Sequence, residues 1–481
     1  MPKKICNFTP TVIILWLLFF SIPFSAKLPL WNLGPIKNEY STIYLYGTDI
    51  LIFLFLGCLL WRKEFDVSIF LKNKIKLLIF ILAAFLLFVF LSIFASSDPA
   101  LSFYQVFKFT EFIAVFSALI FYRENIFTST PQRTNSILED KTAIDSPQSI
   151  IENKKNKEVW GLGLNMVASA VVSSALLQSF LGIAQFFTKK SIGLRFLGEG
   201  ALGLQIGGSS TFWAGAEKYL RAYGTTPHPN ILAAFLFLAL VLLAYLFFKQ
   251  TDKKNIKQIV LYEIALAVLT LGFLLTFSRT ALFWGILILL ILGLWMARKF
   301  KTFGAKIFLS SFLAFIFLSV LIIWQPLFTR ANISVSEDAF TQRVLYIETA
   351  SKMIGDNPFL GVGMGGFTLS MQKPLQDLIG SKDVQPWIYQ PVHNIYLLAF
   401  SEIGLFGFLA FVGLMFFVFW SLRKNLKDFS NPYLIILIGF LFFGLTDHYL
   451  WSLQTGRLML WVVLGLCLRF YFRGFTLTDE K

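Results

Sequence analysis

The sequence is poor in charge, in cysteine and in histidine. Only 14% of its 481 residues are charged, whereas 56% are hydrophobic and 56 residues are phenylalanine. No soluble domain needs that much apolar surface, so the composition excludes the soluble globular classes and indicates a polytopic membrane protein. The three cysteines fall in or beside apolar segments, which excludes a disulfide framework. The three histidines are scattered and have few carboxylates in motif spacing, so we expect neither a metal site nor a cofactor.

The excess of basic residues has two interpretations. A formal net charge of +15 is compatible with nucleic-acid binding. In a membrane protein, however, lysine and arginine gather in cytoplasmic loops. We therefore expect a lipid bilayer as the partner of this chain, and no nucleic acid.

Long apolar runs predict an all-α fold with about twelve transmembrane helices. A helix needs about 20 apolar residues to cross roughly 30 Å of hydrocarbon. The candidate spans are 10–26, 41–61, 76–95, 101–122, 159–187, 230–248, 257–278, 281–297, 305–323, 393–421, 432–447 and 457–472.

The distribution of basic residues predicts the orientation. Most of the 42 lysines and arginines fall in inner segments when the N-terminus is cytoplasmic, and both termini are then cytoplasmic. This divides the chain into N-terminal helices (1–122), a polar, flexible cytoplasmic linker (123–158), a transmembrane core (159–472) and a cytoplasmic tail (473–481). The core carries two long outer segments, 188–229 and 324–392.

One outer segment contains an amphipathic helix by its periodicity. In TQRVLYIETASKMIG the apolar residues Val344, Ile347, Ala350 and Ile354 recur at helical spacing. We expect this helix to lie along the outer surface and to end before Pro358.

The most informative stretch is HNIYLLAFSEIGLFG, which begins at His393. If the helix begins at this histidine, Gly404 and Gly407 lie on the same face as its ring. Missing side chains on that face favour close packing of another helix. Glu402 is expected on the opposite face.

Three arginines are predicted to lie in the same outer compartment as His393. Arg221 precedes the sixth span, Arg279 lies in a tight turn between two apolar spans, and Arg343 begins the surface helix. Arginines near helix ends commonly extend to lipid phosphate. Arg279 is less easily explained in this way, because a charge at membrane depth is costly and usually functional. Several arginines beside one histidine suit a phosphate leaving group and a general base.

Other polar residues give weaker signals. His228 lies between two prolines, either at a helix entry or in the site. Asp447, His448 and Arg457 lie at the outer ends of the last two spans and are candidates to line the same cavity. The G-x-G-x-x-G spacing that contains Gly361 and Gly363 lacks a βαβ context, so it predicts a tight loop with backbone amides near the site rather than a dinucleotide site.

Charged residues within the N-terminal spans have a structural interpretation. Lys108 and Glu111 are three residues apart, and we expect them to neutralise each other, with a proton relay as the alternative. Asp49 has no obvious partner.

Together these motifs resemble the O-antigen ligase and Wzy-polymerase superfamily. The superfamily has the signature H-N/S/Q-x9-G-x-x-G. The present sequence resembles it, with His393-Asn394 followed after nine residues by Gly404 and then by Gly407. The blocks RAYGTTPHPN, SRTA and DNPFLGVGMGGF precede that signature in the family's order. The resemblance runs from about residue 215 to 415. Ligases, glycan polymerases and protein O-oligosaccharyltransferases of the superfamily share these motifs.

The resemblance implies a GT-C-type glycosyltransferase of the cytoplasmic membrane, with its active site facing the periplasm or cell exterior. The donor would be a glycan on undecaprenyl diphosphate, and the acceptor a hydroxyl of a glycan, lipid or protein. His393 would act as the base on that hydroxyl or position it. Arg279 and Arg343 would hold the diphosphate, and the reaction would be metal-independent. Further substrate-binding residues would be Arg221, His228, Asn394, Gly361 and Gly363.

Two alternatives remain open. A Wzy-type polymerase has the same signature as a ligase. A transporter of an anionic or lipid-linked solute would also use basic residues in an outer cavity. Transporters more often have broken helices or paired repeats near the midplane, and the sequence predicts neither.

Overall fold

A computed structural model describes residues 9–33, 39–66, 68, 73–123, 164–249, 255–299, 303–331, 338–381, 384–428 and 431–473. The predicted linker at 123–158 lies outside these residues except for Arg123, and the predicted tail except for Arg473.

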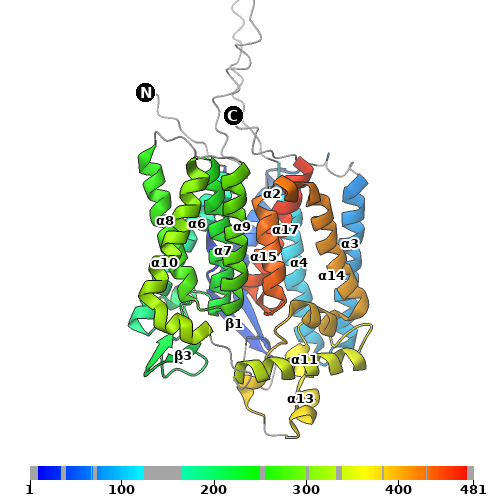
Figure 1. The fold of residues 1–481 in the computed structure, drawn as a ribbon. Helices are drawn as coiled ribbons and strands as arrows, with labels where there is room; N and C mark the ends of the chain where they lie inside the picture. Colours follow the sequence, from blue (N-terminus) through cyan, green and yellow to red (C-terminus); the bar gives the residue numbers. More distant parts are fainter. Residues whose placement is uncertain are drawn as a thin grey trace, which may run out of the picture.

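The described chain forms a bundle of apolar helices (Figure 1). Nine helices in this part of the chain are long and apolar enough to cross a membrane, which makes the chain an integral membrane protein by length and composition. They are α3 (Asn73–Leu91), α4 (Pro99–Phe121), α6 (Leu164–Thr188), α7 (Pro229–Lys249), α8 (Ile256–Leu275), α9 (Arg279–Lys299), α10 (Phe303–Ala331), α14 (Ile395–Asp428) and α17 (Gln454–Arg473). Three shorter apolar helices are α1 (Pro10–Ser21), α2 (Gly47–Trp61) and α15 (Pro432–Gly444). Each helix falls on an expected span, and the number of spans remains a prediction.

Short polar caps set several helix starts. The side chains of Thr9, Asp98 and Asn431 accept hydrogen bonds from backbone amides in the first turns of α1, α4 and α15. A proline follows each cap at the first position of the helix, where its missing N–H has no cost. These three residues therefore explain where the apolar runs become helical.

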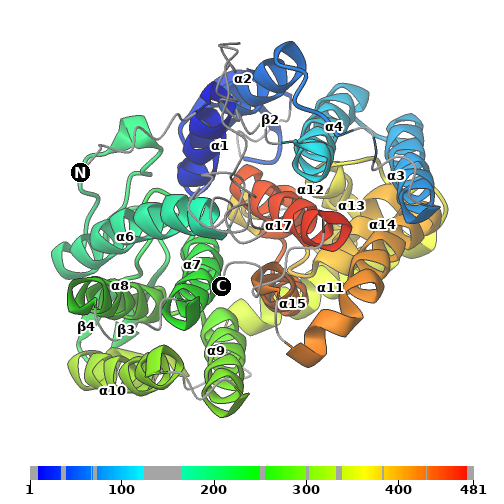
Figure 2. The same cartoon turned by 90° about the horizontal axis from the view of Figure 1, so that it is seen from above.

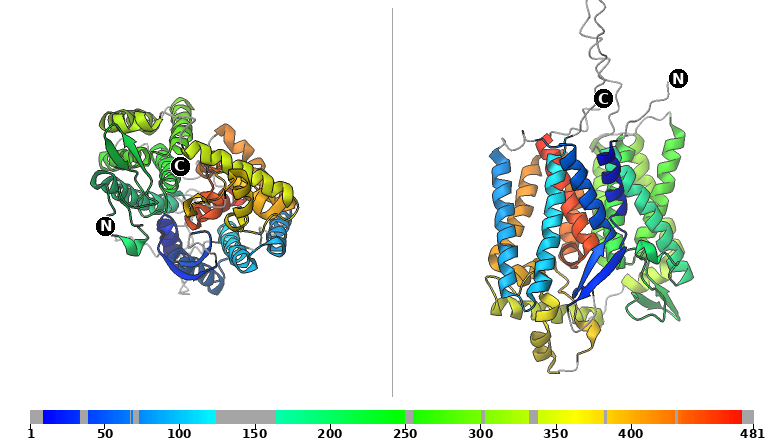
Figure 3. Two further views of the ribbon diagram at one scale, coloured as in Figure 1. Left: turned by 90° about the horizontal axis from the view of Figure 1, so that it is seen from below. Right: turned by 180° about the vertical axis from the view of Figure 1, so that it is seen from behind.

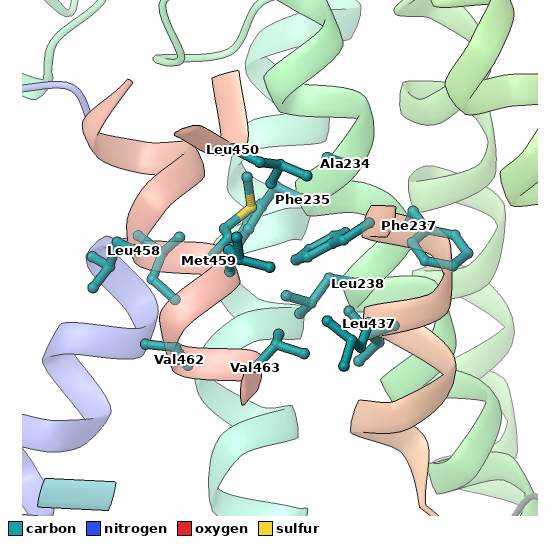
Figure 4. Close-up of a cluster of buried hydrophobic side chains, with 14 of the residues drawn as sticks. Ala234, Phe235, Phe237, Leu238, Leu437, Leu450, Leu458, Met459, Val462 and Val463 are labelled. Carbon is teal, nitrogen blue, oxygen red and sulfur yellow. The ribbon is translucent and has the colours of Figure 1, made fainter. Parts of the chain in front are cut away.

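Helices α7 and α17 form the centre of the bundle. Seen from above, the other helices surround them (Figure 2). In the most apolar stretch of each helix, 94% of the residues of α7 and 89% of those of α17 are buried inside the protein. The corresponding share is 22% for the peripheral α3 and α10. In Figure 4, Phe235 and Leu238 of α7 lie close to Met459 and Val463 of α17, with Leu437 of α15 beside them. The peripheral helices instead present apolar side chains outward, as expected for lipid contact.

The smaller elements gather at one end of the bundle (Figures 1 and 3). Two antiparallel hairpins, which the sequence did not predict, are β1 (Lys27–Asn32) with β2 (Thr42–Tyr46) and β3 (Thr211–Ala214) with β4 (Glu217–Leu220). The short helices are η2 (Ser92–Ala95), η3 (Arg195–Leu197), α12 (Phe367–Ser370), α13 (Gln372–Ile379), η4 (Pro386–Ile388) and α16 (Tyr449–Ser452). We call this end the loop end.

The predicted surface helix is confirmed as α11 (Asp338–Asp356), which lies across the loop end (Figure 1). Its buried face differs from the expected one. Tyr346, Ala350 and Met353 are buried, whereas Val344 and Ile347 are 41% and 45% exposed. The helix therefore packs on the bundle through one stripe and presents a second apolar stripe outward.

Helix α14 differs most from its prediction. It begins at Ile395, so His393 precedes it, and its backbone breaks at Gly404, where φ is 67° and ψ is −174°. The prediction of a continuous helical face from His393 to Gly407 is therefore wrong. The expected close partner at Gly404 is a loop rather than a helix: a Cβ there would lie 2.1 Å from the Phe359 carbonyl oxygen.

The loop that follows α11 fills the break in α14. The amides of Val362 and Gly363 donate to the carbonyls of Ser401 and Glu402 at 2.9 and 3.0 Å, and the amide of Leu405 donates to the carbonyl of Pro358 at 2.8 Å. Buried carbonyls freed by the break thereby regain partners. The sequence predicted no broken helices. This prediction is also wrong for α10, which is kinked at Ile323 and contains Pro326.

The buried charges of Asp49, Lys108 and Glu111 are paired. Lys108 Nζ lies 2.6 Å from Glu111, which confirms that pair, and also 2.6 Å from Asp49, so the prediction that Asp49 lacks a partner is wrong. Gln454 Nε2 donates to the same Asp49 oxygen at 2.6 Å. The cluster joins α2, α4 and the start of α17 by charge and hydrogen bonds.

Arg457 and Glu402 lie in a neighbouring polar cluster inside the bundle. Arg457 Nη1 donates to Gln105 Oε1 at 2.6 Å and its Nε bonds to the Trp451 carbonyl. Trp451 Nε1 in turn donates to Glu402 at 2.8 Å. Arg457 therefore does not line the outer cavity as predicted, because its guanidinium is used to hold α17 against α4.

Candidate active site

A cavity of about 250 Å³ lies at the loop end of the bundle. Its walls come from segments far apart in the sequence and include all three histidines of the chain. The lining residues are Glu39, Tyr40, Pro227, His228, Ile231, Trp387, Tyr389, Gln390, His393, Asp447, His448, Tyr449 and Leu453. The expectation that the histidines are scattered is therefore wrong, because the fold brings the starts of α7, α14 and α16 together.

His393 is held just before α14 by its neighbours. Asn394 accepts hydrogen bonds from the amides of Tyr396 and Leu397 at 2.9 and 3.0 Å, which caps the helix. The His393 ring stacks on Tyr346 of α11, with centroids 5.7 Å apart. Its Nδ1 is buried and has no hydrogen-bond partner among the described residues. Burial lowers the pKa of His393, so its imidazole is neutral at neutral pH.

Asp447 and His448 line the cavity, which confirms that prediction. The ring of His448 meets that of His393 edge-on, with centroids 5.0 Å apart. His448 Nδ1 lies 2.6 Å from Ser452 Oγ, one turn of α16 later. Burial lowers the pKa of His448 to about 3.

The Asp447 carboxylate connects α16 to the start of α7. It accepts hydrogen bonds from the His448 amide at 2.8 Å and from Asn230 Nδ2 at 2.5 Å. Burial alone would raise the pKa of Asp447, but the three histidines and Asn230 outweigh it and hold the pKa well below its usual value. The cavity therefore contains a fixed negative charge beside neutral imidazoles.

Arg221 is used to build this wall rather than to face open space. Its guanidinium donates to Asn230 Oδ1 and to the Thr276 carbonyl at 2.6 Å, and to Ser210 Oγ at 2.8 Å. The side chain is 4% exposed. Burial lowers the pKa of Arg221 to about 9, with Arg330 and Arg279 acting in the same direction, so it remains protonated at neutral pH.

The buried loop between Arg221 and α7 is fixed by two glutamines of α6. Gln185 Oε1 accepts the amides of Tyr223 and Gly224 at 3.0 and 2.9 Å, and Gln178 Oε1 accepts the amide of Thr225 at 2.7 Å. Gly224 has a φ of +58° and lies against Gln178, so a side chain there would clash. The RAYGTTPHPN block is thus a rigid support for the cavity.

His228, at the end of that block, is both a helix-entry residue and part of the cavity wall. Its Nδ1 accepts the amide hydrogen of Asn230 at 3.2 Å, and its carbonyl accepts from Ile231 at 3.0 Å. Burial and the charge of Arg221 lower its pKa to about 3. The ring is therefore neutral and held at one nitrogen.

The remaining predicted arginines lie around the cavity but not in its lining. The charge of Arg343 lowers the pKa of both His393 and His448, so its guanidinium acts on the cavity. Arg279 begins α9, immediately after the turn whose Thr276 carbonyl accepts from Arg221. Arg330, at the end of α10, lies over the Phe212 ring at 5.7 Å and was missed by the sequence reasoning. Arg221, Arg279 and Arg330 therefore form a basic cluster beside the cavity.

Three residues predicted to bind substrate have structural contacts instead of facing the cavity. Gly361 has a φ of +69° and its Cβ would lie 2.5 Å from the carbonyl carbon of Glu402. The Gly363 amide donates to Glu402, and Asn394 Nδ2 donates to the Leu445 carbonyl at 3.1 Å. None of the three lines the cavity. Their direct contact with substrate remains a prediction.

Several lining residues were missed from the sequence, namely Glu39, Tyr40, Trp387, Tyr389 and Gln390. The run WIYQ immediately before the His393 signature was a usable signal, because aromatic and amide side chains gather there in an otherwise polar loop. Within the described ranges, no three His, Cys, Asp or Glu side chains are arranged to hold a metal ion.

Comparison with known proteins adds one finding. Residues 264–412 match the family model described as O-Antigen ligase. The matched part runs from α8 into α14 and includes Arg279, Arg343 and His393, but not Arg221, His228 or Asp447. The chain matches no curated protein.

Proposed function

We propose that this membrane protein, whose residues 264–412 match the O-Antigen ligase family model, transfers a glycan from undecaprenyl diphosphate to an acceptor hydroxyl. The observation that carries the proposal is the cavity in which His393, His228, His448 and Asp447 meet at the loop end of an apolar bundle. Family resemblance alone supports the coarser class, a membrane enzyme of lipid-linked glycan assembly.

The reaction is a substitution at the anomeric carbon of the donor sugar. The acceptor oxygen forms a bond to that carbon, the bond to the diphosphate oxygen breaks, and the acceptor proton moves to a base. We propose His393 as that base, since burial keeps its imidazole neutral and therefore able to accept a proton. The developing imidazolium is favoured by the Asp447 carboxylate, whose charge raises the pKa of His393.

The leaving diphosphate needs positive charge. Arg279 and Arg343 are proposed to hold it, because guanidinium groups bind phosphate oxygens in a bidentate manner. Arg221 already donates three hydrogen bonds, to Asn230, Thr276 and Ser210, so its proposed role is to position α7 and to add charge to the cluster. Positioning and electrostatics then supply most of the catalysis, without a metal ion.

The architecture agrees with a GT-C-type enzyme in having an apolar helical bundle with its polar site at one end. We propose that this end faces the periplasm or cell exterior and that the protein is in the cytoplasmic membrane. The basic-residue asymmetry of the sequence supports this orientation.

Reconstituted transfer tests the proposal. The purified protein, in vesicles with a labelled undecaprenyl-diphosphate glycan and a hydroxyl acceptor, should release undecaprenyl diphosphate and label the acceptor. Chelator should leave the rate unchanged. Translocation of the labelled donor without transfer would instead support the transporter alternative, which the break in α14 at Gly404 favours. Elongation of the donor glycan itself would identify a polymerase.

A further inference from the structure

The two histidines beside His393 have different hydrogen-bond partners at Nδ1. Ser452 Oγ lies 2.6 Å from His448 Nδ1 and 3.1 Å from the His448 carbonyl oxygen. Both contacts are hydrogen bonds in the tautomer in which His448 Nδ1 donates to the hydroxyl and the hydroxyl donates to the carbonyl. A neutral imidazole has one N–H, so this tautomer has a lone pair on His448 Nε2. No described residue bonds that nitrogen, and the side chain lines the cavity.

His228 has the reverse arrangement. The Asn230 amide donates to His228 Nδ1, so this nitrogen carries the lone pair and the proton is on Nε2. Burial keeps both rings neutral, as their pKa values near 3 indicate. With His448 Nδ1 donating to Ser452, the cavity contains one hydrogen-bond acceptor, His448 Nε2, and one donor, His228 Nε2–H.

The cavity also has an exposed aromatic side chain on a hydrogen-bonded loop. Trp387 lines the cavity and remains 66% exposed. Two hydrogen bonds hold the backbone here: Tyr346 Oη donates to the Ile388 carbonyl at 2.8 Å, and Gln390 Nε2 donates to the Trp387 carbonyl at 2.9 Å. Exposing an indole costs hydrophobic free energy, which a ligand with an apolar face would recover.

A pyranose ring matches this combination. It presents an apolar face of C–H groups that can stack on an indole, and adjacent hydroxyls that donate and accept at once. A serine or threonine side chain has a single hydroxyl and no such face. Glu39, paired with Lys27 at 2.5 Å, adds a carboxylate to the cavity wall that can accept from a further hydroxyl.

We propose that Trp387, His448 and His228 form an acceptor subsite for a sugar, with the pyranose face on Trp387 and adjacent hydroxyls between the two imidazoles. This rests on the proposed transferase function, in which His393 takes the proton of a neighbouring hydroxyl. It names the acceptor class, a glycan rather than a peptide.

Sugar binding without donor tests the subsite. The full-length protein in lipid nanodiscs is mixed with a panel of methyl hexopyranosides, and saturation-transfer NMR measures their binding. Trp387→Ala should weaken binding of the best pyranoside about tenfold, the order expected for loss of one aromatic contact. The matched control is Trp213→Ala, since Trp213 is 63% exposed on β3 and does not line the cavity. That variant should bind like the wild type.

Two further measurements address the imidazoles and the alternatives. Ser452→Ala frees the His448 ring to exchange tautomers and should also weaken binding, whereas 2-methoxytetrahydropyran, which lacks ring hydroxyls, should not bind. Equal binding by wild type and Trp387→Ala, or stronger binding of a serine peptide, overturns the subsite. If pyranosides bind as expected but no labelled glycan is transferred, the transferase function fails and the subsite stands.

Discussion

At the scale of single residues, the polar side chains around the cavity are of two kinds. The side chains of Arg221, Asn230 and Asn394 hydrogen-bond to other protein groups, so they support the wall. His393 differs, because its Nδ1 has no hydrogen-bond partner in the part of the chain that the structure describes. A buried polar atom without a partner is costly, which favours a role toward substrate over a role in packing.

The first prediction concerns His393. His393→Ala should retain binding of the lipid donor but lose transfer, because the proposed base acts on the acceptor and not on the diphosphate. His393→Gln keeps a hydrogen-bonding group but cannot take the proton, so it should be severely impaired as well. Transfer of labelled glycan is measured beside donor binding on the same preparation. Wild-type turnover by His393→Ala would eliminate this residue as the base.

The second prediction concerns Arg279 and Arg343. Alanine at either position should lower the transfer rate about 30- to 1000-fold, which corresponds to losing about 2–4 kcal/mol of charge stabilisation in the transition state. Arg279→Lys should also be poor, because a lysine lacks the bidentate fork.

Arg195 supplies the control for this series. It is exposed on η3 and is not among the lining residues, so Arg195→Ala removes a positive charge without touching the site. Its transfer rate should equal that of the wild type. A near-normal rate for the Arg279 or Arg343 alanine variant would remove that arginine from the diphosphate site.

At the scale of the elements, the break in α14 joins the two most informative motifs of the sequence. The glycine-rich loop after α11 donates backbone hydrogen bonds into the gap at Gly404, so the loop and the break depend on each other. Both motifs therefore need glycine for the same physical reason, because the two backbones approach each other closely.

The third prediction tests this dependence. Gly404→Ala forces a non-glycine residue to φ +67° and places its Cβ 2.1 Å from the Phe359 carbonyl oxygen. Strain alone should cost about 1–3 kcal/mol, so thermal unfolding in detergent should occur at a lower temperature. Gly413→Ala is the control on the same helix, where a Cβ would meet nothing within 4 Å. That change should be neutral or stabilise by roughly 0.5–1 kcal/mol. Equal unfolding temperatures for the two variants would contradict the packing described here.

The same elements show how far sequence reasoning reaches. Apolar runs long enough to span a bilayer predicted every apolar helix, because hydropathy is a local property. The break at Gly404 was not predicted, since nothing local separates a glycine that clears a helix face from one that adopts a positive φ. The hairpins were missed for a similar reason, because β1 and β3 are short and their pairing partners lie across turns.

The site could be predicted only in part. Arg343 and His393 were recognised from residue type and position, and Asp447 and His448 from their place at helix ends. Glu39 and Tyr40 could not have been found, because their approach to the cavity depends on a tertiary contact between the segment before β2 and the start of α16, where the rings of Tyr40 and His448 meet. Three-dimensional neighbours of this kind leave no local pattern.

At the scale of the whole molecule, sidedness decides whether the site can meet its substrates. Hydrogen bonds place the turns at Arg221, Thr276, Asn394 and Leu445 at one end of the bundle, together with α11. Most lysines and arginines in the sequence belong to segments predicted to lie at the opposite side. Because such residues are retained in the cytoplasm, the end with the cavity should be the outer one.

The last prediction tests that orientation. Single cysteines are placed at Gln385, which is exposed in the predicted outer segment 324–392, and at Ser136 in the predicted linker 123–158, in a background where the native cysteines are replaced. An impermeant thiol reagent added to intact cells should label Gln385→Cys and spare Ser136→Cys until the membrane is permeabilised. Labelling both after permeabilisation controls for reactivity of the thiols. If the reagent reached Ser136→Cys from outside, the cavity would face the cytoplasm, the donor would be presented on the inner leaflet, and the proposed route of transfer at the outer face would have to be abandoned.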